Sequence, residues 1–267
     1  MTTAAQDRVI AVNGLTFRCR VDGTEGAPWL VFSNSMMTDL TLWDAQVAAL
    51  GDRFRILRYD QRGHGGTSVS PGDCTFDQLV EDAVALFDVF GIGRAHVVGV
   101  SMGAATALRL AARFSDRIQS VVMADGQAAT PPTGAQAWAE RIDLARREGM
   151  AALVEPTIAR WFRPAFIASG SPVLDDVRRM IRGTPIDGFA RCARALQAYD
   201  FRDDLGKLRC PTLLLVGAAD GALPATMRDM ACSVTGALFV EIDEAGHLPN
   251  VEQPERFNAA LTAFLNP

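Results

Sequence analysis

The stretch from Arg94 to Phe114 reads RAHVVGVSMGAATALRLAARF, and it decides the fold. Its first part is apolar and β-branched, as in a buried strand, and its second part is rich in alanine and leucine, as in a helix. The two parts meet at Gly99-Val100-Ser101-Met102-Gly103, which matches G-x-S-x-G. Glycine flanks the serine because a Cβ atom would clash in so sharp a turn. The pattern predicts an exposed serine nucleophile, with the amide of Met102 directed at a developing oxyanion.

A serine nucleophile needs a base and an acid further along the chain. In folds built on this turn, the order is serine, then Asp or Glu, then His. His247 is the one histidine after Ser101, and it follows the predicted strand Leu238–Ile242. Asp220 follows a buried strand that begins at Pro211, and open parallel sheets carry their chemistry at the carboxyl ends of the strands. Ser101, Asp220 and His247 are therefore the predicted catalytic residues.

Asp125 is the alternative acid, because it ends the predicted strand Ile118–Ala124 and some hydrolases of this architecture take the acid from that position. A turn or helix-capping role is the simpler interpretation for whichever aspartate is not used. The two histidines before the serine are predicted to be structural. We expect His64 to brace a glycine-rich turn and His96 to lie at the far end of the serine strand.

Alternating strand and helix patterns surround the serine turn and predict a parallel sheet with helices on both faces. Asn13-Gly14 signals a type I′ hairpin between two short strands. The alternation breaks between residues 127 and 199, where helical patterns dominate, and it returns at Pro211. We predict an α/β fold with a mostly parallel, doubly wound sheet, formed by residues 1–126 and 200–267, and a helical cap at 127–199 over the site.

The predicted strands cover residues 9–12, 15–20, 29–33, 54–59, 95–100, 118–124 and 238–242, with one more from 211. The predicted helices cover residues 42–50, 76–90, 102–114, 135–147, 150–162, 173–181, 188–198 and about 254–265.

Composition fits one enzyme domain with an insertion. The 267 residues are 49% hydrophobic and can bury a large core. A net charge of −5 without a basic cluster argues against binding of nucleic acid. Because no signal pattern or membrane-length apolar run occurs, we expect a cytoplasmic protein without a membrane partner. The five cysteines are scattered, so neither a disulfide, a metal nor a cofactor is implied.

Further motifs accompany the serine turn: Ser33–Met36, Thr38–Asp44, Leu57–Gly65 and His247–Pro254, with Ala137–Arg141, Arg160–Phe162, Gly188–Leu196 and Tyr199–Arg202 in the predicted cap. Together they resemble the 3-oxoadipate enol-lactonase group of the α/β-hydrolase superfamily, over nearly the whole chain. The resemblance implies the α/β-hydrolase fold and serine-esterase chemistry that opens an unsaturated lactone in aromatic catabolism. It also implies Ser101 as nucleophile, His247 as base, Asp220 as its partner, and the amides of Met36 and Met102 as the oxyanion hole.

The chain departs from that group near the expected pocket. Met37 and Ala104 stand where glycine is usual, Phe189 replaces a common tyrosine, and Asp125-Gly126 replaces an Asn-Thr ending. Methionine and phenylalanine at these positions predict a narrower, more apolar pocket. The predicted pocket residues are Met37, Trp138, Trp161, Phe189, Arg141 and Arg160. Arg141, Arg160 and Arg163 are candidates to pair with a substrate carboxylate, and exposed positions on helix faces are the alternative.

The expected partner is a small ester or lactone, and the sequence leaves a homo-oligomer open. The same three catalytic residues also suit another carboxylic ester, a carbon–carbon bond of a β-diketone-type ring-cleavage product, or perhydrolysis. Outside enzymes, the alternative is a ligand-binding receptor of the same fold.

Overall fold

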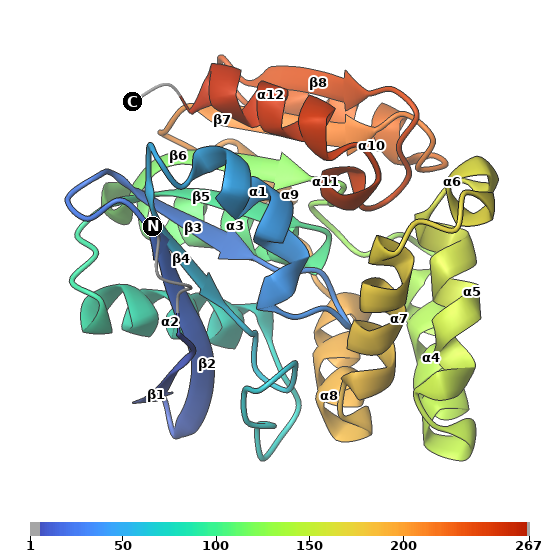
Figure 1. The fold of residues 1–267 in the computed structure, drawn as a ribbon. Helices are drawn as coiled ribbons and strands as arrows, with labels where there is room; N and C mark the ends of the chain where they lie inside the picture. Colours follow the sequence, from blue (N-terminus) through green and yellow to red (C-terminus); the bar gives the residue numbers. More distant parts are fainter. Residues whose placement is uncertain (1–5, 266–267) are drawn as a thin grey trace.

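Eight strands form one sheet in the computed structural model, which describes residues 6–265 (Figure 1). The strands are β1 (Arg8–Val12), β2 (Leu15–Gly23), β3 (Trp29–Ser33), β4 (Arg55–Tyr59), β5 (Ala95–Val100), β6 (Ile118–Ala124), β7 (Thr212–Gly217) and β8 (Leu238–Ile242). Their order is β1-β2-β4-β3-β5-β6-β7-β8. Strand β2 pairs antiparallel with both neighbours, and every pair from β4 to β8 is parallel. The predicted mostly parallel, doubly wound sheet is confirmed.

The helices alternate with the strands except in one long segment. They are η1 (Leu40–Trp43), α1 (Asp44–Leu50), α2 (Phe76–Val89), α3 (Met102–Arg113), η2 (Ser115–Arg117), α4 (Gly134–Glu148), α5 (Ala151–Trp161), α6 (Pro164–Ala168), α7 (Val173–Gly183), α8 (Ile186–Gln197), α9 (Arg202–Leu205), α10 (Leu223–Cys232), α11 (Pro249–Glu252) and α12 (Pro254–Phe264). We call α4 to α8 the helical insertion. Residues 1–5 and 266–267 of the predicted core ranges lie outside the described residues.

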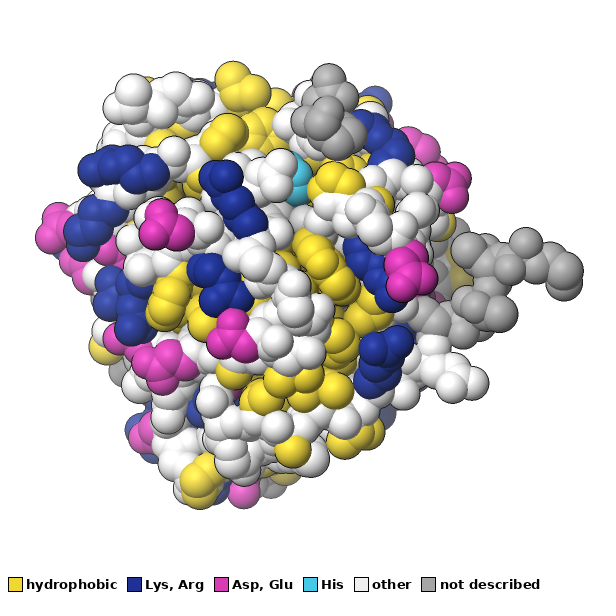
Figure 2. All heavy atoms as spheres, turned by 90° about the vertical axis from the view of Figure 1, so that its left-hand side faces the viewer, with side chains coloured by type: hydrophobic (Ala, Val, Ile, Leu, Met, Phe, Trp, Pro, Cys, Tyr) yellow, Lys and Arg dark blue, Asp and Glu magenta, His cyan; other side chains and the backbone are white. Residues whose placement is uncertain are grey.

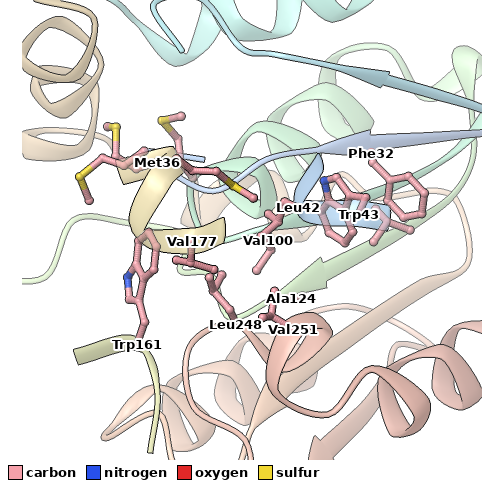
Figure 3. Packing of buried hydrophobic residues seen from close by; sticks show 14 of the residues in the cluster. Phe32, Met36, Leu42, Trp43, Val100, Ala124, Trp161, Val177, Leu248 and Val251 are labelled. Atoms are coloured by element: carbon pink, nitrogen blue, oxygen red, sulfur yellow. The ribbon is translucent and has the colours of Figure 1, made fainter. Parts of the chain in front are cut away.

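Two hydrophobic clusters fill the two faces of the sheet. Because side chains alternate along a strand, Leu30 and Phe32 of β3 point to one cluster and Val31 to the other. The cluster of Leu30 continues under α1 and α12 and into the helical insertion (Figure 3). There Phe32 stacks on Trp43, with ring centroids 4.5 Å apart. The other cluster lies under α2, α3 and α10.

The parallel strands point toward the helical insertion, which stands beside their carboxyl ends (Figure 1). A bridge between Ala129 and Asp200 brings the two ends of this segment together. On the opposite side of the insertion, Gly188 of α8 meets Gly63 so closely that a Cβ atom on Gly188 would lie 2.0 Å from the Gly63 carbonyl oxygen. The insertion therefore packs against the core through backbone as well as side chains.

The outer surface carries mixed charge. On the face shown in Figure 2, basic and acidic side chains are interspersed, with hydrophobic side chains between them. Among residues 6–265, no helix combines the length and the apolar character needed to cross a bilayer.

The junction between β5 and α3 leaves no space beside its glycines. A Cβ atom on Gly99 would lie 2.0 Å from the carbonyl oxygen of Gly103, and one on Gly103 would lie 2.1 Å from that of Ser33. These are contacts with backbone, which cannot rotate away as a side chain can. The strand, the helix and the end of β3 are therefore fixed against one another at this turn.

Gly103→Ala should lower the free energy of unfolding by about 2 kcal/mol or more, since overpacking a close-packed site costs about 1–3 kcal/mol. In a chain of this size, that corresponds to a fall in Tm of roughly 4–8 °C. Gly93→Ala is the matched control, because a Cβ atom there meets nothing within 4 Å. Thermal unfolding of both variants checks this. Equal Tm values for the two would contradict the packing described at the turn.

Candidate active site

Ser101 occupies the turn between β5 and α3 in a conformation that non-glycine residues rarely adopt. Its φ is 57° and its ψ is −115°. Such a conformation costs about 1–3 kcal/mol and persists only where the surrounding structure imposes it. The surroundings do so here, since the Ser101 amide donates to the carbonyl oxygen of Ala124 at 2.8 Å. Its side chain is thereby directed out of the sheet, where Oγ lies 2.9 Å from Nε2 of His247.

His247 is held from three sides in the loop after β8. Its Nδ1 lies 2.6 Å from Oδ2 of Asp220, and its backbone amide donates to the carbonyl oxygen of Trp161 at 2.7 Å. The indole of Trp161 also stacks on the imidazole, with centroids 6.0 Å apart. A carboxylate only accepts hydrogen bonds, so Nδ1 carries the proton and Nε2 is left to accept from the serine hydroxyl.

Asp220 lies at the carboxyl end of β7. Burial alone would raise the pKa of its carboxyl, but the charge and hydrogen bond of His247, together with the charge of Arg160, hold that pKa below its usual value. Asp220 is therefore ionised at neutral pH. Asp125, the alternative acid, is buried one strand away, and its Oδ1 accepts from the amide of Gly217 at 2.9 Å. The structure thus joins His247 to Asp220, not to Asp125.

Met36 and Met102 carry the two amides predicted for the oxyanion hole. Met36 lies in the turn after β3, and Met102 is the first residue of α3, where a helix leaves its N–H groups free. Within residues 6–265, neither amide donates a backbone hydrogen bond. Amides without a backbone acceptor are what the predicted oxyanion hole requires.

His64 braces the turn that contains Met36, in agreement with its predicted structural role. Its Nδ1 lies 3.0 Å from the carbonyl oxygen of Arg62, and its Nε2 lies 3.2 Å from Sδ of Met36. Complete burial lowers the pKa of His64 to about 4, so the ring is neutral. His96 is also buried, and its Nδ1 lies 2.7 Å from Oγ of Ser120 at the start of the sheet's central strands.

A cavity of about 280 Å³ opens beside Ser101 and His247. Of the residues predicted for the pocket, Trp138, Arg141 and Arg160 line it. The sequence patterns did not predict several other lining residues. Most of them lie just before α4 or close to the end of α8, and one follows Asp220: Gln127, Pro131, Thr133, Leu196, Tyr199 and Leu223. What could have identified them in the sequence is their position, either at a boundary of the helical insertion or shortly after a predicted catalytic residue.

Three predicted pocket residues do not line this cavity. Phe189 is fully buried and packs behind Trp138, with ring centroids 6.3 Å apart. Met37 is fully buried as well, with Sδ 4.0 Å from a guanidinium nitrogen of Arg141. Trp161 lies beside His247 and holds it. Met37 and Phe189 therefore contact lining residues from behind, and the narrower pocket stays a prediction.

Arg141 and Arg160 bring positive charge to the cavity. Arg141 donates to Oγ1 of Thr157 at 2.9 Å and lies over the ring of Trp138, 4.7 Å from its centroid. Burial and the like charge of Arg160 lower the pKa of Arg141 to about 9, so it stays charged at neutral pH. Among the described residues, neither arginine forms an ion pair with a carboxylate. Arg163, in contrast, pairs with Glu252 at 2.9 Å.

Asp125, Asp220 and His247 each place one possible metal-ligand atom within 4.8 Å of the others. Both ring nitrogens of His247 are already engaged, by Asp220 and Ser101. In the described part of the chain, the group is thus a hydrogen-bonded chain that ends at the serine hydroxyl.

The chain resembles known proteins over nearly its whole length. Residues 10–260 match the model of the alpha/beta hydrolase family. The chain is 34% identical to 3-oxoadipate enol-lactonase 2 of Acinetobacter baylyi, over 99% of this chain and 96% of that protein. It also resembles the crystal structure of the enol-lactonase from Burkholderia xenovorans LB400, with a TM-score of 0.93 and 38% identity over 97% and 100% of the two chains. A malate-bound thermophilic esterase from Thermogutta terrifontis has a TM-score of 0.90 and 32% identity over 98% of each chain.

Proposed function

This chain belongs to the alpha/beta hydrolase family, and we propose that it is a serine hydrolase that opens a lactone or ester carrying a carboxylate, most similar in reaction to a 3-oxoadipate enol-lactonase of aromatic catabolism. The observation that carries the proposal is the hydrogen-bonded chain from Asp220 through His247 to Ser101, at 2.6 and 2.9 Å, beside a cavity. A serine, a histidine and a carboxylate in this order activate a hydroxyl for attack on a carbonyl.

In the proposed mechanism, Nε2 of His247 takes the hydroxyl proton as Oγ of Ser101 bonds to the carbonyl carbon. The carbonyl oxygen becomes an oxyanion, which the amides of Met36 and Met102 stabilise. When the carbon–oxygen bond of the ester or lactone breaks, His247 returns the proton to the leaving oxygen. A water molecule then attacks the acyl group, with His247 again as base, and releases the acid and the free serine.

The proposed specificity comes from the cap at residues 127–199, which contains the helical insertion and lies over the cavity. Arg141 and Arg160 lie in the cavity without a carboxylate partner in the described chain, so a carboxylate on the substrate is the ligand that their charge favours. Two comparisons support an anionic substrate: a relative is named as a 3-oxoadipate enol-lactonase, and the structure of the esterase from Thermogutta terrifontis is malate bound.

Ser101→Ala should reduce turnover of lactone or ester by about three orders of magnitude or more, because no other group forms the acyl-enzyme. The fold should persist, with a Tm close to that of the wild type. A phosphonate probe should label the wild type at Ser101 and not this variant. Ser169→Ala, at an exposed serine, is the control. Retention of a tenth of the activity in Ser101→Ala would rule out the acyl-enzyme, and a wild type without turnover would favour a receptor.

Asp220→Asn should lower kcat by about three to four orders of magnitude, because an amide that donates to Nδ1 leaves the imidazole in the wrong tautomer. Because a carboxamide has nearly the same size and shape as a carboxylate, circular dichroism should be unchanged. Steady-state kinetics on a p-nitrophenyl ester measure the effect. A fall of less than tenfold would show that another group orients His247.

Arg141→Met should raise KM for an anionic lactone or ester by about 10- to 100-fold, since a hydrogen bond to a charged group contributes about 1.5–3 kcal/mol. It should change KM for a neutral ester of the same size by less than about threefold. Arg146→Met, at an exposed position of the same helix, controls for overall charge. An equal effect of Arg141→Met on the two substrates would exclude the proposed carboxylate contact.

A further inference from the structure

Asp125 is more tightly constrained than a turn residue needs to be. It follows β6 with a φ of 45°, and its side chain is 1% exposed. Its amide donates to the carbonyl oxygen of Leu215 at 3.0 Å, and its Oδ1 accepts from the amide of Gly217 at 2.9 Å. Both contacts are with β7, which ends three residues before Asp220. The Asp125 carboxyl is thus fixed beside the strand that carries the catalytic acid.

The second oxygen of Asp125 has an unusual environment. Oδ2 is buried and receives no hydrogen bond from any donor in residues 6–265. The Asp220 carboxyl is close to it, because one ligand-type atom each of Asp125, Asp220 and His247 lies within 4.8 Å of the other two. Two ionised carboxylates at such a distance repel each other strongly. A buried acceptor without a donor is also costly, and one proton between the two carboxyls would remove both costs.

The surroundings decide which carboxyl holds that proton. The charged groups that face the pair are His247 from the loop after β8, Arg160 from α5 and Arg141 from α4. The first two act on Asp220 and favour its ionised form. Asp125 has one backbone donor and is enclosed, so burial, and then the charge of Asp220, raise the pKa of Asp125 well above its usual value. The proton therefore belongs on Oδ2 of Asp125.

We propose that Asp125 is a positioning residue that remains protonated at neutral pH and donates a hydrogen bond to Asp220, which keeps the Asp220 carboxylate facing His247. The inference rests on the proposed function in that Asp220 is the catalytic acid. The neutral carboxyl has two effects: it anchors Asp220 from behind, and it keeps a second negative charge away from the base. A second negative charge would favour the protonated imidazole, which cannot accept the proton of the serine hydroxyl.

The test compares pH profiles of kcat/KM for the wild type, Asp125→Asn and Asp125→Ala on one p-nitrophenyl ester. An asparagine can accept from Gly217 and donate to Asp220, so it reproduces both contacts of a protonated aspartate. Asp125→Asn should keep kcat within about threefold of the wild type. The acidic limb, which is the part of the profile where kcat/KM rises with pH, should stay at the same pH. Asp125→Ala lacks the donor, so kcat should fall about tenfold or more and the limb should move to higher pH. Asp116→Asn, at an exposed aspartate, controls for net charge.

Two results would overturn the proposal. If Asp125 is ionised, Asp125→Asn removes a negative charge beside His247. The acidic limb of the profile should then move to lower pH by about one pH unit or more. If Asp125 only supports the backbone of Gly217, Asp125→Ala should lower Tm without moving the limb.

A second measurement does not depend on turnover or on the stability of Asp125→Ala. Infrared difference spectra between Ser101→Ala and Ser101→Ala/Asp125→Asn at neutral pH should show a carbonyl stretch of a protonated carboxylic acid that the double variant lacks. Absence of that band refutes the protonated state. Because the Ser101→Ala background is inactive under the proposed function, this result is separate from whether the protein hydrolyses esters.

Discussion

The turn at Ser101 leaves no room for a side chain on either flank, and the rest of the site depends on that constraint. A Cβ atom on Gly99 would lie 2.0 Å from the carbonyl oxygen of Gly103, and a Cβ atom on Gly103 would lie 2.1 Å from the carbonyl oxygen of Ser33. The contact of Gly103 with Ser33 brings the end of β3 against the start of α3. As a result, one tight packing arrangement both fixes the turn that carries Ser101 and holds it against the end of β3, which leads into the turn that contains Met36.

The sequence patterns predicted the central sheet well, because its strands are continuous buried runs. The ranges 29–33, 95–100 and 118–124 match β3, β5 and β6. The range 238–242 also matches β8, although that edge strand is only partly buried. The order of Ser101, Asp220 and His247 along the chain also led to three side chains that the fold brings into contact. Short helices such as α6 and α9 were missed, because packing against neighbours, not periodicity, decides whether four or five residues form a turn of helix.

The pocket was harder to predict because adjacency in sequence does not give the direction of a side chain. Met37 follows the oxyanion residue, yet its side chain lies behind Arg141. Ala104 and Gly126 are a second case in which contacts in the fold could not be predicted from the sequence. A Cβ atom on Gly126 would lie 2.4 Å from that of Ala104, so the two departures from the related group are one exchange of volume between α3 and the loop after β6. The sequence presents them as independent changes.

The carbonyl oxygen of Trp161, which ends α5, holds the amide of His247, and it lies 2.4 Å from the position of a Cβ atom on Gly246. One part of the helical insertion is thus joined to the catalytic loop by backbone. For the evolution of new specificities, the insertion is then not a freely exchangeable module. A transplant from a relative would have to reproduce the end of α5 and the backbone contact of Gly188 in α8 with Gly63, whereas α4, which presents Trp138 and Arg141 to the cavity, is free to diversify.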